Sequence, residues 1–397
     1  MDLKILDIKD TCTGCGACVS ACNAKALTLS YDDEGFYFPH INESNCVNCR
    51  LCEKVCHVIN NPPHTDVSKN YNAYMLKALE KDLVMNSSSG GAFSLLSEVI
   101  LSRGGVIYGA SYNYEKECLE HTSTEHVPLD ALRKSKYVES YTGDVFRSVY
   151  QNLRDSKYVL FCGTPCQING LSTYLSSKNI QTDRLITVRF ICHGVPSNKF
   201  FTEYKHFEER RYKSKITHID FRNKSNGWKN ICYSFEFENG KRKVGNFYES
   251  YYYNLFFQDI LLRRSCYSCK YVLQETSDIT IADFWGINAY RPENNEIEGV
   301  SLIMTHNKKA EDLLLEISDK CSTELIPHEY LDYIYRDVDN KSLKLGVRQS
   351  LMPAILKNGY MHEAQRMLKS KINRYIIRKF ILSVYHPLVK CFKKTSK

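Results

Sequence analysis

Eight cysteines near the start of the chain repeat one spacing twice. Each run reads C-x2-C-x2-C-x3-C; the first is Cys12, Cys15, Cys18 and Cys22, and the second is Cys46, Cys49, Cys52 and Cys56. Cysteine thiolates at three-residue intervals can wrap one edge of an iron–sulfur cluster. Zinc sites usually take two separated C-x2-C pairs instead, and a disulfide framework belongs to an oxidising compartment. The two runs therefore predict two 4Fe–4S clusters.

The spacing resembles that of bacterial ferredoxins, in which the fourth cysteine of each run ligates the other cluster. The expected ligation is therefore crossed. One cluster takes Cys12, Cys15, Cys18 and Cys56, and the other takes Cys46, Cys49, Cys52 and Cys22. Gly14 and Gly16 leave room for the first cluster because they carry no Cβ atom. The proline that usually follows the fourth cysteine is replaced by Asn23 and His57.

Length and charge separate the body of the chain from its tail. The 397 residues suggest two to three domains of about 150 residues each. The formal charge is +8, and residues 366–397 contain ten Lys or Arg and no acid, so the other residues sum to about −2. The first residues do not resemble a signal peptide, and no run of about 18 apolar residues could span a membrane. We expect a cytoplasmic protein that does not bind nucleic acid.

The tail combines an apolar stripe with basic flanks. Residues recur at four-residue steps along the stripe, which is Leu368, Ile372, Ile376, Phe380 and Val384. A basic amphipathic helix of this kind can lie on an anionic membrane, which would make the protein peripheral at the inner membrane surface. It can equally pack on the body of the protein or enter a groove of a partner protein. The sequence leaves these three uses open.

Strand and helix signals divide the chain into three parts. Asn60–His64 is rich in turn residues and ends a ferredoxin-type domain, residues 1–61, for which a βαβ arrangement is expected. Strand and helix signals then alternate over residues 70–340, which predicts a mixed α/β domain with some parallel strands. Residues 341–397 are expected to form a helical, basic tail. The predicted fold class is α+β for the first part and α/β for the second.

Several short motifs of the middle domain could bind a cofactor. Ser87–Gly91 precedes an apolar helical stretch, where free N–H groups could cradle a phosphate; an N-cap followed by a turn gives the same pattern. Cys166 and Cys192 each follow a predicted strand, and parallel strands bring such ends to one edge. Cys266 and Cys269 supply two more thiols. These four cysteines could hold a third 4Fe–4S cluster, or some could be buried apolar thiols.

These motifs occur in the order found in the coenzyme F420 hydrogenase/dehydrogenase beta-subunit family, which the chain resembles. The matching stretches are Ser88–Gly91, Ser135–Val138, Cys162–Gln167, Cys192–Ser197, Phe221–Lys224, Gly227–Trp228, Cys266–Cys269 and Asp283–Gly286. They span roughly residues 70 to 290, and the tail lies outside the match. Each stretch is weak alone, whereas the ordered series is quite specific.

The resemblance implies an iron–sulfur flavoprotein that binds FAD and assigns candidate residues to it. The cofactor-binding candidates are Ser88, Ser89, Gly90, Gly91, Lys136 and Asp283. Thr164 and His193 are catalytic candidates because they could donate hydrogen bonds to flavin or substrate. Arg222 and Lys224 are substrate-binding candidates because basic side chains clamp phosphate or carboxylate groups. Each also has an ordinary structural explanation, such as a helix cap, a strand end or a turn.

Two functions are compatible with these features. In the first, the chain is an oxidoreductase whose clusters and FAD exchange electrons with an organic substrate, either coenzyme F420 or another compound. In the second, the chain relays electrons to a partner enzyme and has no substrate of its own. A flavin suits the first because it exchanges single electrons with clusters and a hydride with an organic molecule. The partner is then an electron donor or acceptor protein, or an organic redox substrate; the sequence does not determine the oligomeric state.

Overall fold

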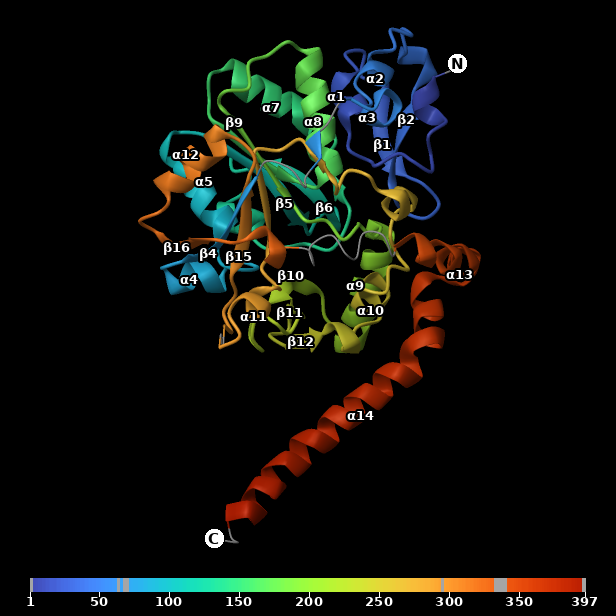
Figure 1. The fold of residues 1–397 in the computed structure, drawn as a ribbon. Helices are drawn as coiled ribbons and strands as arrows, with labels where there is room; N and C mark the ends of the chain where they lie inside the picture. The colour runs from blue at the N-terminus through green and yellow to red at the C-terminus, as the bar shows by residue number, and fades with distance from the viewer. Residues whose placement is uncertain (1–2, 63–64, 67–70, 294–295, 332–340, 395–397) are drawn as a thin grey trace.

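The fold is described by a computed structural model that covers residues 3–62, 65–66, 71–293, 296–331 and 341–394. Figure 1 shows an N-terminal unit beside a large mixed sheet with its helices, and a long C-terminal helix that leaves the body. The mixed α/β core and the helical C-terminal region predicted from the sequence are confirmed.

The N-terminal unit is built around a two-stranded hairpin. Its elements are α1 (Ala17–Ala21), β1 (Leu27–Tyr31), β2 (Tyr37–Ile41), α2 (Leu51–Lys54) and α3 (His57–Asn60). β1 pairs antiparallel with β2, with Leu27 opposite Ile41. The βαβ order expected for this domain is therefore wrong among the described residues. The turn between the strands is too short to hold the crossover helix that parallel strands require.

A nine-stranded mixed sheet forms the centre of the large domain. In chain order its strands are β4 (Asn72–Ala78), β5 (Val106–Asn113), β6 (Cys118–Ser123), β7 (Ser140–Tyr141), β8 (Val159–Gly163), β9 (Leu185–Phe190), β14 (Ile279–Asp283), β15 (Ser301–Thr305) and β16 (Cys321–Leu325). They lie in the order β16-β4-β15-β14-β9-β8-β5-β6-β7. The neighbours β14, β9, β8 and β5 run parallel, so their carboxyl ends meet at one edge of the sheet.

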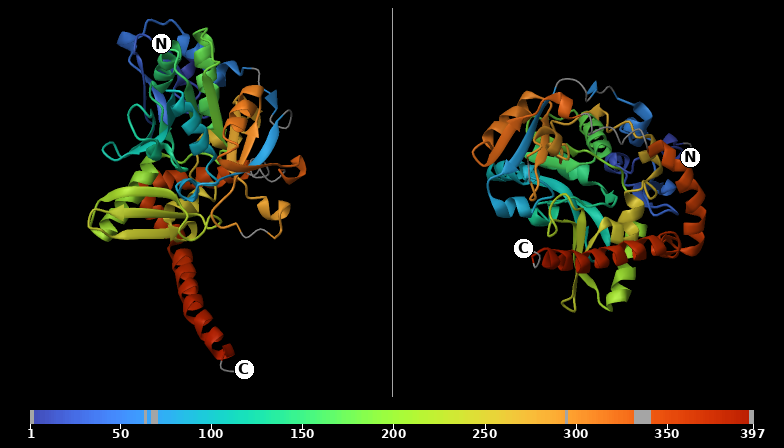
Figure 2. Two further views of the ribbon diagram at one scale, coloured as in Figure 1. Left: turned by 90° about the vertical axis from the view of Figure 1, so that its left-hand side faces the viewer. Right: turned by 60° about the horizontal axis from the view of Figure 1, so that its bottom comes forward.

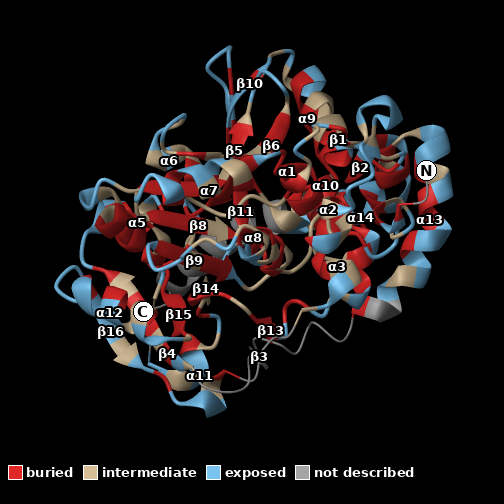
Figure 3. Ribbon diagram, turned by 90° about the horizontal axis from the view of Figure 1, so that it is seen from above, coloured by how far each residue is buried: buried red, intermediate tan, exposed pale blue. Residues whose placement is uncertain are grey.

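Helices cover both faces of this sheet. They are α4 (Lys81–Met85), α5 (Ala92–Ser102), α6 (Leu129–Leu132), α7 (Val145–Arg154), α8 (Pro165–Ser177), α11 (Ile287–Tyr290) and α12 (Lys308–Glu316). Successive residues of a strand face opposite sides. Ile107 and Leu160 accordingly pack in the layer of α5 and α12, whereas Tyr108 and Phe161 pack in that of α7 and α8. Figure 3 shows these strands and helix faces as the buried centre of the molecule.

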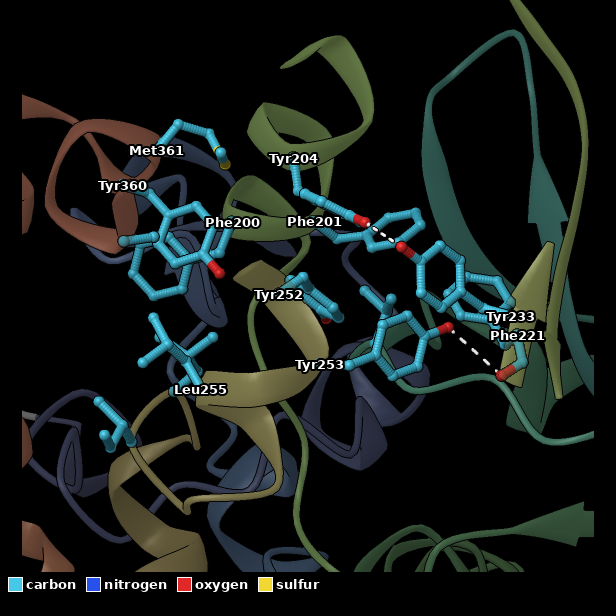
Figure 4. Close-up of a cluster of buried hydrophobic side chains, with 14 of the residues drawn as sticks. Phe200, Phe201, Tyr204, Phe221, Tyr233, Tyr252, Tyr253, Leu255, Tyr360 and Met361 are labelled. Carbon is cyan, nitrogen blue, oxygen red and sulfur yellow. Dashed lines mark hydrogen bonds between the residues drawn. The ribbon is translucent and has the colours of Figure 1, made fainter. Parts of the chain in front are cut away.

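A second core, rich in tyrosine, lies beside the sheet. It is formed by β10 (Ile216–Asn223), β11 (Cys232–Phe237), β12 (Arg242–Asn246), α9 (Asn198–Tyr212), α10 (Tyr251–Phe256), α13 (Leu345–Asn358) and the start of α14 (Tyr360–Lys394). The Tyr204 hydroxyl donates to the Tyr233 hydroxyl at 2.9 Å (Figure 4). Tyr360 stacks on Phe200 with ring centroids 5.0 Å apart. These tyrosines anchor the C-terminal helices to the body. A short ladder of β3 (Thr65–Asp66) and β13 (Gln274–Glu275) completes the strands.

Helix α14 has a buried start and an exposed continuation. Leu368 and Ile372 are buried in the tyrosine-rich core, and the Tyr375 hydroxyl accepts a hydrogen bond from Asn246 at 2.9 Å. Residues 376–378 are all exposed, and Figure 2 shows the helix extending away from the body. The side chains of Phe380 and Val384 lie outside the described part of the chain. No helix of the described residues is long and apolar enough to cross a bilayer.

A buried ion pair joins the N-terminal unit to the large domain. Arg263 Nη1 lies 2.5 Å from Glu139 Oε1, and both side chains are buried. The Arg263 Nε–H donates to the Cys12 carbonyl at 2.7 Å, and the Tyr37 N–H donates to Glu139 Oε2 at 2.9 Å. Burial raises the pKa of the Glu139 carboxyl to about 7, against the opposing effect of Arg263. Two residues of the large domain thus bind both the first cysteine run and the hairpin.

Helix α8 packs on the N-terminal unit so closely that Gly170 has no room for a side chain. An ideal Cβ on Gly170 would lie 2.8 Å from Cys15 Sγ. Exchanging glycine for alanine inside a helix normally stabilises a protein by up to about 1 kcal/mol. We predict that Gly170→Ala instead lowers the free energy of unfolding by about 1–3 kcal/mol, because the contact is overpacked.

Ser172→Ala is the matched control, since Ser172 is exposed on the same helix. It should leave the free energy of unfolding unchanged or raise it slightly. Anaerobic urea titrations of the two variants and the parent measure the difference. A Gly170→Ala variant as stable as Ser172→Ala would show that the two units do not touch at this position.

Candidate functional site

The first predicted cluster site is a small cavity inside the N-terminal unit. Four cysteines line it together, and they are Cys12, Cys15, Cys18 and Cys56. Three of them are buried, and Cys15 is half-buried. Burial raises the pKa of the Cys15 thiol to about 12. Because iron is bound by thiolates, filling this site has to release protons. Cys56 lies with the first run rather than the second, as crossed ligation requires.

The second predicted cluster site lies at the outer end of the same unit. Its predicted ligands are Cys22, Cys46, Cys49 and Cys52. Cys49 is exposed, whereas Cys52 is buried on α2. Burial raises the pKa of the Cys52 thiol to about 11, and the charges of Glu53 and Cys22 add to the shift. Cys22 and Cys46 pack with Cys52 in the core of the N-terminal unit.

Backbone N–H groups support sulfur atoms in both sites and in a third set of cysteines. The donor–acceptor pairs are Gly14 N to Cys12 Sγ at 3.5 Å, Ala26 N to Cys22 Sγ at 3.2 Å, Asn48 N to Cys46 Sγ at 3.4 Å and Gly194 N to Cys192 Sγ at 3.4 Å. Hydrogen bonds of this kind favour the thiolate and tune the reduction potential of a cluster. The donor sets therefore fit iron–sulfur clusters.

A cavity of about 720 Å³ lies in the large domain at the carboxyl edge of the parallel strands. Its wall includes the serine–glycine loop before α5, the segment 132–140, the loops after β8 and β9, and the end of β14. Thr13 and Gly14 of the first cysteine run also line it, so the cavity reaches the N-terminal unit. This volume falls within the range of about 300–1,000 Å³ that is usual for small-molecule sites.

Four cysteines from separate segments meet in the wall of this cavity. Cys166 begins α8, Cys192 follows β9, and Cys266 and Cys269 come from the turn after α10. Burial raises the pKa of the Cys166 thiol, and the three other cysteines add to the shift. Among the described residues no three of these sulfurs lie within 4.8 Å of one another. Tetrahedral zinc would need about 3.8 Å between sulfurs, so the four sulfurs as they stand do not form a site for a single zinc ion.

Tyr271 lies near cysteines of both the first cluster site and this set of four. Burial raises its pKa, and the shift is increased by Cys166, Cys15, Cys269 and Cys56. The His57 ring meets the Tyr271 ring edge-on, with centroids 4.7 Å apart. Burial lowers the pKa of His57 to about 3, so the imidazole is neutral. The packed rings of His57 and Tyr271 therefore lie near thiols of both sets.

The serine–glycine loop presents a helix start to the cavity. Ser88, Ser89 and Gly91 line the cavity, as do the first residues of α5, which has no side-chain cap. The serine hydroxyls are already bonded within the protein: Ser88 to Ser135 at 3.0 Å and Ser89 to the Val300 carbonyl at 2.6 Å. Backbone N–H groups of α5, rather than these hydroxyls, are therefore the groups free to hold an anion.

Gly90 serves the packing behind this loop. It does not line the cavity, and its N–H donates to Ser301 Oγ at 2.9 Å. An ideal Cβ there would lie 2.1 Å from the Leu76 carbonyl oxygen. Gly91 has φ of +99°, a left-handed conformation that favours glycine. The glycine pair is thus explained by close packing and backbone conformation.

Lys136 and His193 lie in the cavity wall. Lys136 Nζ donates to the Arg133 carbonyl at 2.6 Å, and burial lowers its pKa to about 7. His193 Nε2 lies 2.8 Å from Asp259 Oδ1, and its ring meets Phe256 edge-on. Both are available to a bound ligand.

Thr164 caps helix α8 and also lines the cavity. Its hydroxyl accepts from the Gln167 N–H at 3.4 Å, and Gln167 Oε1 accepts from the Thr164 N–H at 2.9 Å. The same hydroxyl lies 3.1 Å from Cys166 Sγ. Thr164 therefore fixes the helix start that carries Cys166, and its hydroxyl is already engaged.

The three remaining candidates lie at or behind the same wall. Asp283 lines the cavity and accepts from Trp228 Nε1 at 2.8 Å, and Arg222 pairs with it at 3.6 Å. Arg222 is fully buried behind the wall; its Nε and Nη1 have no hydrogen-bond partner among the described residues. Lys224 does not line the cavity: its ammonium donates to the carbonyls of Val84 and Ser89 at 2.7 and 2.6 Å. Lys224 thus supports the serine–glycine loop from behind.

Sequence reasoning missed several residues of this region. Glu139 and Arg263 join the cavity to the N-terminal unit, and Tyr271 packs on His57 of that unit. His121 lines the cavity as a buried side chain whose pKa is lowered to about 4 by burial. Only Glu139 had a local signal, because it directly follows the Ser135–Val138 motif. The others depend on contacts between residues far apart in the sequence.

Comparison with known proteins identifies two segments. Residues 156–329 match the family of the C terminus of the coenzyme F420 hydrogenase/dehydrogenase beta subunit, and residues 11–59 match the 4Fe-4S dicluster domain. These matches confirm the predicted resemblance. The Ser88–Gly91 and Ser135–Val138 motifs lie before residue 156, where the match to the beta-subunit family begins. The chain thus combines an iron–sulfur domain with a domain from an oxidoreductase family.

No curated protein matches the chain. Among solved structures, a similar chain comes from the F420-reducing NiFe hydrogenase complex of Methanosarcina barkeri, studied by xenon derivatization. The sequence identity is 14%, the match covers 70% of this chain and 91% of that chain, and the TM-score is 0.48.

We predict that replacing Cys266 and Cys269 together by serine removes about four irons per chain and leaves the N-terminal clusters in place. We expect this loss because Cys266 and Cys269 lie in the same cavity wall as Cys166 and Cys192, the other two proposed ligands. Cys162→Ser is the matched control, because Cys162 lines the same cavity and is not a proposed ligand. Iron and sulfide analysis after anaerobic purification measures the loss. Equal iron contents in the double variant and the control would make the pair structural.

Proposed function

We propose that the chain is an iron–sulfur flavoprotein oxidoreductase. Electrons pass between the ferredoxin-type clusters and an organic donor or acceptor by way of FAD bound in the large cavity. The proposal rests on the observation that the first cluster cavity and the large cavity share a wall. Thr13 and Gly14 line both cavities. FAD supplies the chemistry of joining one-electron and two-electron transfer.

The residues that would hold FAD follow from the cavity wall. The uncapped start of α5 suits its phosphates, since N–H groups and the helix dipole favour an anion. Lys136 adds a cation when it is protonated, and an anion bound beside it would raise its pKa from about 7. His193, whose Nε2 lies 2.8 Å from Asp259, keeps its Nδ1 for a hydrogen bond with flavin or substrate. Arg222 can contribute its unpartnered N–H groups only if the side chains in front of it move.

The four cysteines in the wall would hold a third 4Fe–4S cluster between the ferredoxin domain and the flavin. In this proposal residues 1–61 form the ferredoxin-type domain, residues 70–340 the flavin-binding domain and residues 341–397 the helical tail. The protein lies in the cytoplasm. The organic substrate is coenzyme F420 or another compound. A relay subunit that passes electrons to a partner enzyme is the second candidate, and the match to a beta-subunit family favours it.

Anaerobic purification followed by iron, sulfide and flavin analysis tests the proposal. We expect about one FAD per chain with about eight irons for two clusters, or about twelve with the third. Absence of flavin in protein that retains its iron would contradict the flavoprotein. Turnover of the isolated chain with dithionite and candidate acceptors then separates the two functions. A chain that reduces an acceptor only after a partner is added is a relay.

We also propose that the exposed part of α14 rests on an anionic membrane surface. Beyond the buried Ile372, the exposed residues include Arg374, Ile376, Ile377 and Arg378, which pair apolar with basic side chains. Residues 366–397 contain no acid, so the charge is complementary to anionic lipid. Each basic side chain near such a surface contributes about 1 kcal/mol.

Removing residues 376–397 should abolish sedimentation with vesicles rich in anionic lipid and leave the protein folded. The cut is placed after Tyr375 because Leu368 and Ile372 belong to the core. Neutral vesicles are the control and should bind neither form. Equal sedimentation of full and shortened chains with anionic vesicles would rule out membrane docking.

A further inference from the structure

We propose that the loop of residues 46–50, together with the exposed edge of the second cluster site, is the docking surface for an acidic one-electron carrier protein. The inference rests on the two N-terminal clusters of the proposed function. It adds the place at which electrons enter or leave the chain through a protein.

The cysteine sets differ sharply in their access to solvent. Cys49 is the exposed member of the second site, and Cys46 and Cys22 are half-buried. The first site has three buried cysteines and lies against α8 at Gly170. The four cysteines of the large domain lie in a cavity wall. Of the three sets, the second is the one whose edge a protein can approach from outside.

The loop that covers this edge is a projecting tip. Val47, beside Cys46, is 72% exposed, and Asn48 and Arg50 adopt left-handed backbone conformations with φ of 53° and 55°. Small molecules bind in concave sites that bury most of their surface. A projecting tip with an apolar residue at its end suits contact with another protein instead.

Chemistry and charge specify the kind of partner. A cluster accepts or donates single electrons, so its protein partner is a one-electron carrier. Three exposed cations flank the four cysteines, and they are Lys25, Arg50 and Lys54. Arg50 pairs with the half-buried Glu53 at 3.6 Å, which leaves Lys25 and Lys54 against the exposed Glu43 and one positive charge in excess. Complementary rim charge speeds encounter, and redox partners bury small interfaces, usually below about 1,200 Å².

The decisive experiment compares Val47→Asp with Leu315→Asp. Leu315 is 71% exposed on α12, and its element lies on the other side of the molecule from the N-terminal unit (Figure 1). The probe is a small acidic bacterial ferredoxin, reduced and mixed with the oxidised chain in a stopped-flow instrument. We expect Val47→Asp to lower the second-order rate constant of cluster reduction about tenfold and Leu315→Asp to leave it unchanged.

Dithionite reduction of the same samples should be equal, because a small reductant needs no docking surface. If Val47→Asp loses iron, Lys54→Glu is used as the second variant. Lys54 is exposed, and neither of its neighbours in the sequence is a cysteine. Equal rates for the loop variant and Leu315→Asp would overturn the proposal. The readout is cluster reduction, so a chain without flavin would refute the proposed flavoprotein and still give a valid result here.

Discussion

The buried pair of Arg263 and Glu139 determines how the two halves of the protein meet. Leaving either charge without the other in the interior would be strongly destabilising, so the pair holds only when both halves are in place. Arg263 reaches the backbone of Cys12, and Glu139 reaches that of Tyr37. The same two side chains line the large cavity. One interaction therefore takes part in both the seat of the N-terminal unit, which Arg147 and Arg348 also hold, and one wall of the cavity.

The parallel strands determine the rest of the site. β8, β9 and β14 end at one edge, and each end delivers a functional segment: Cys166 after β8, Cys192 after β9 and Asp283 at the end of β14. The antiparallel strands on both sides also line the cavity, through His121 on β6 and Ser301 on β15, but they carry none of the four cysteines. Cofactor chemistry is concentrated where the sheet is parallel because only parallel neighbours bring successive strand ends together.

The sequence predicts best what local spacing controls. Three-residue intervals between cysteines follow from the shape of a cubane cluster, so the dicluster domain is readable from one short segment. The hairpin of β1 and β2 also depends on residues close together in the sequence. The βαβ order was expected for ferredoxin-type domains in general, and the short turn between β1 and β2 rules it out. Lys224 could not be judged from its motif, because its partners, Val84 and Ser89, are 140 and 135 residues away. The same holds for Arg263 and Tyr271, whose partners lie in the first 60 residues.

The tight contact of Gly170 with Cys15 has a consequence for biogenesis. Three of the four thiols of the first site are buried, and the fourth, Cys15, lies against α8 at Gly170. A scaffold protein that delivers a preformed cluster has to reach those thiols directly. In the folded chain the inner thiols are covered, so delivery of a cluster to them requires an opening of the structure. The outer site, with Cys49 exposed, has one thiol that a scaffold protein can reach without such an opening.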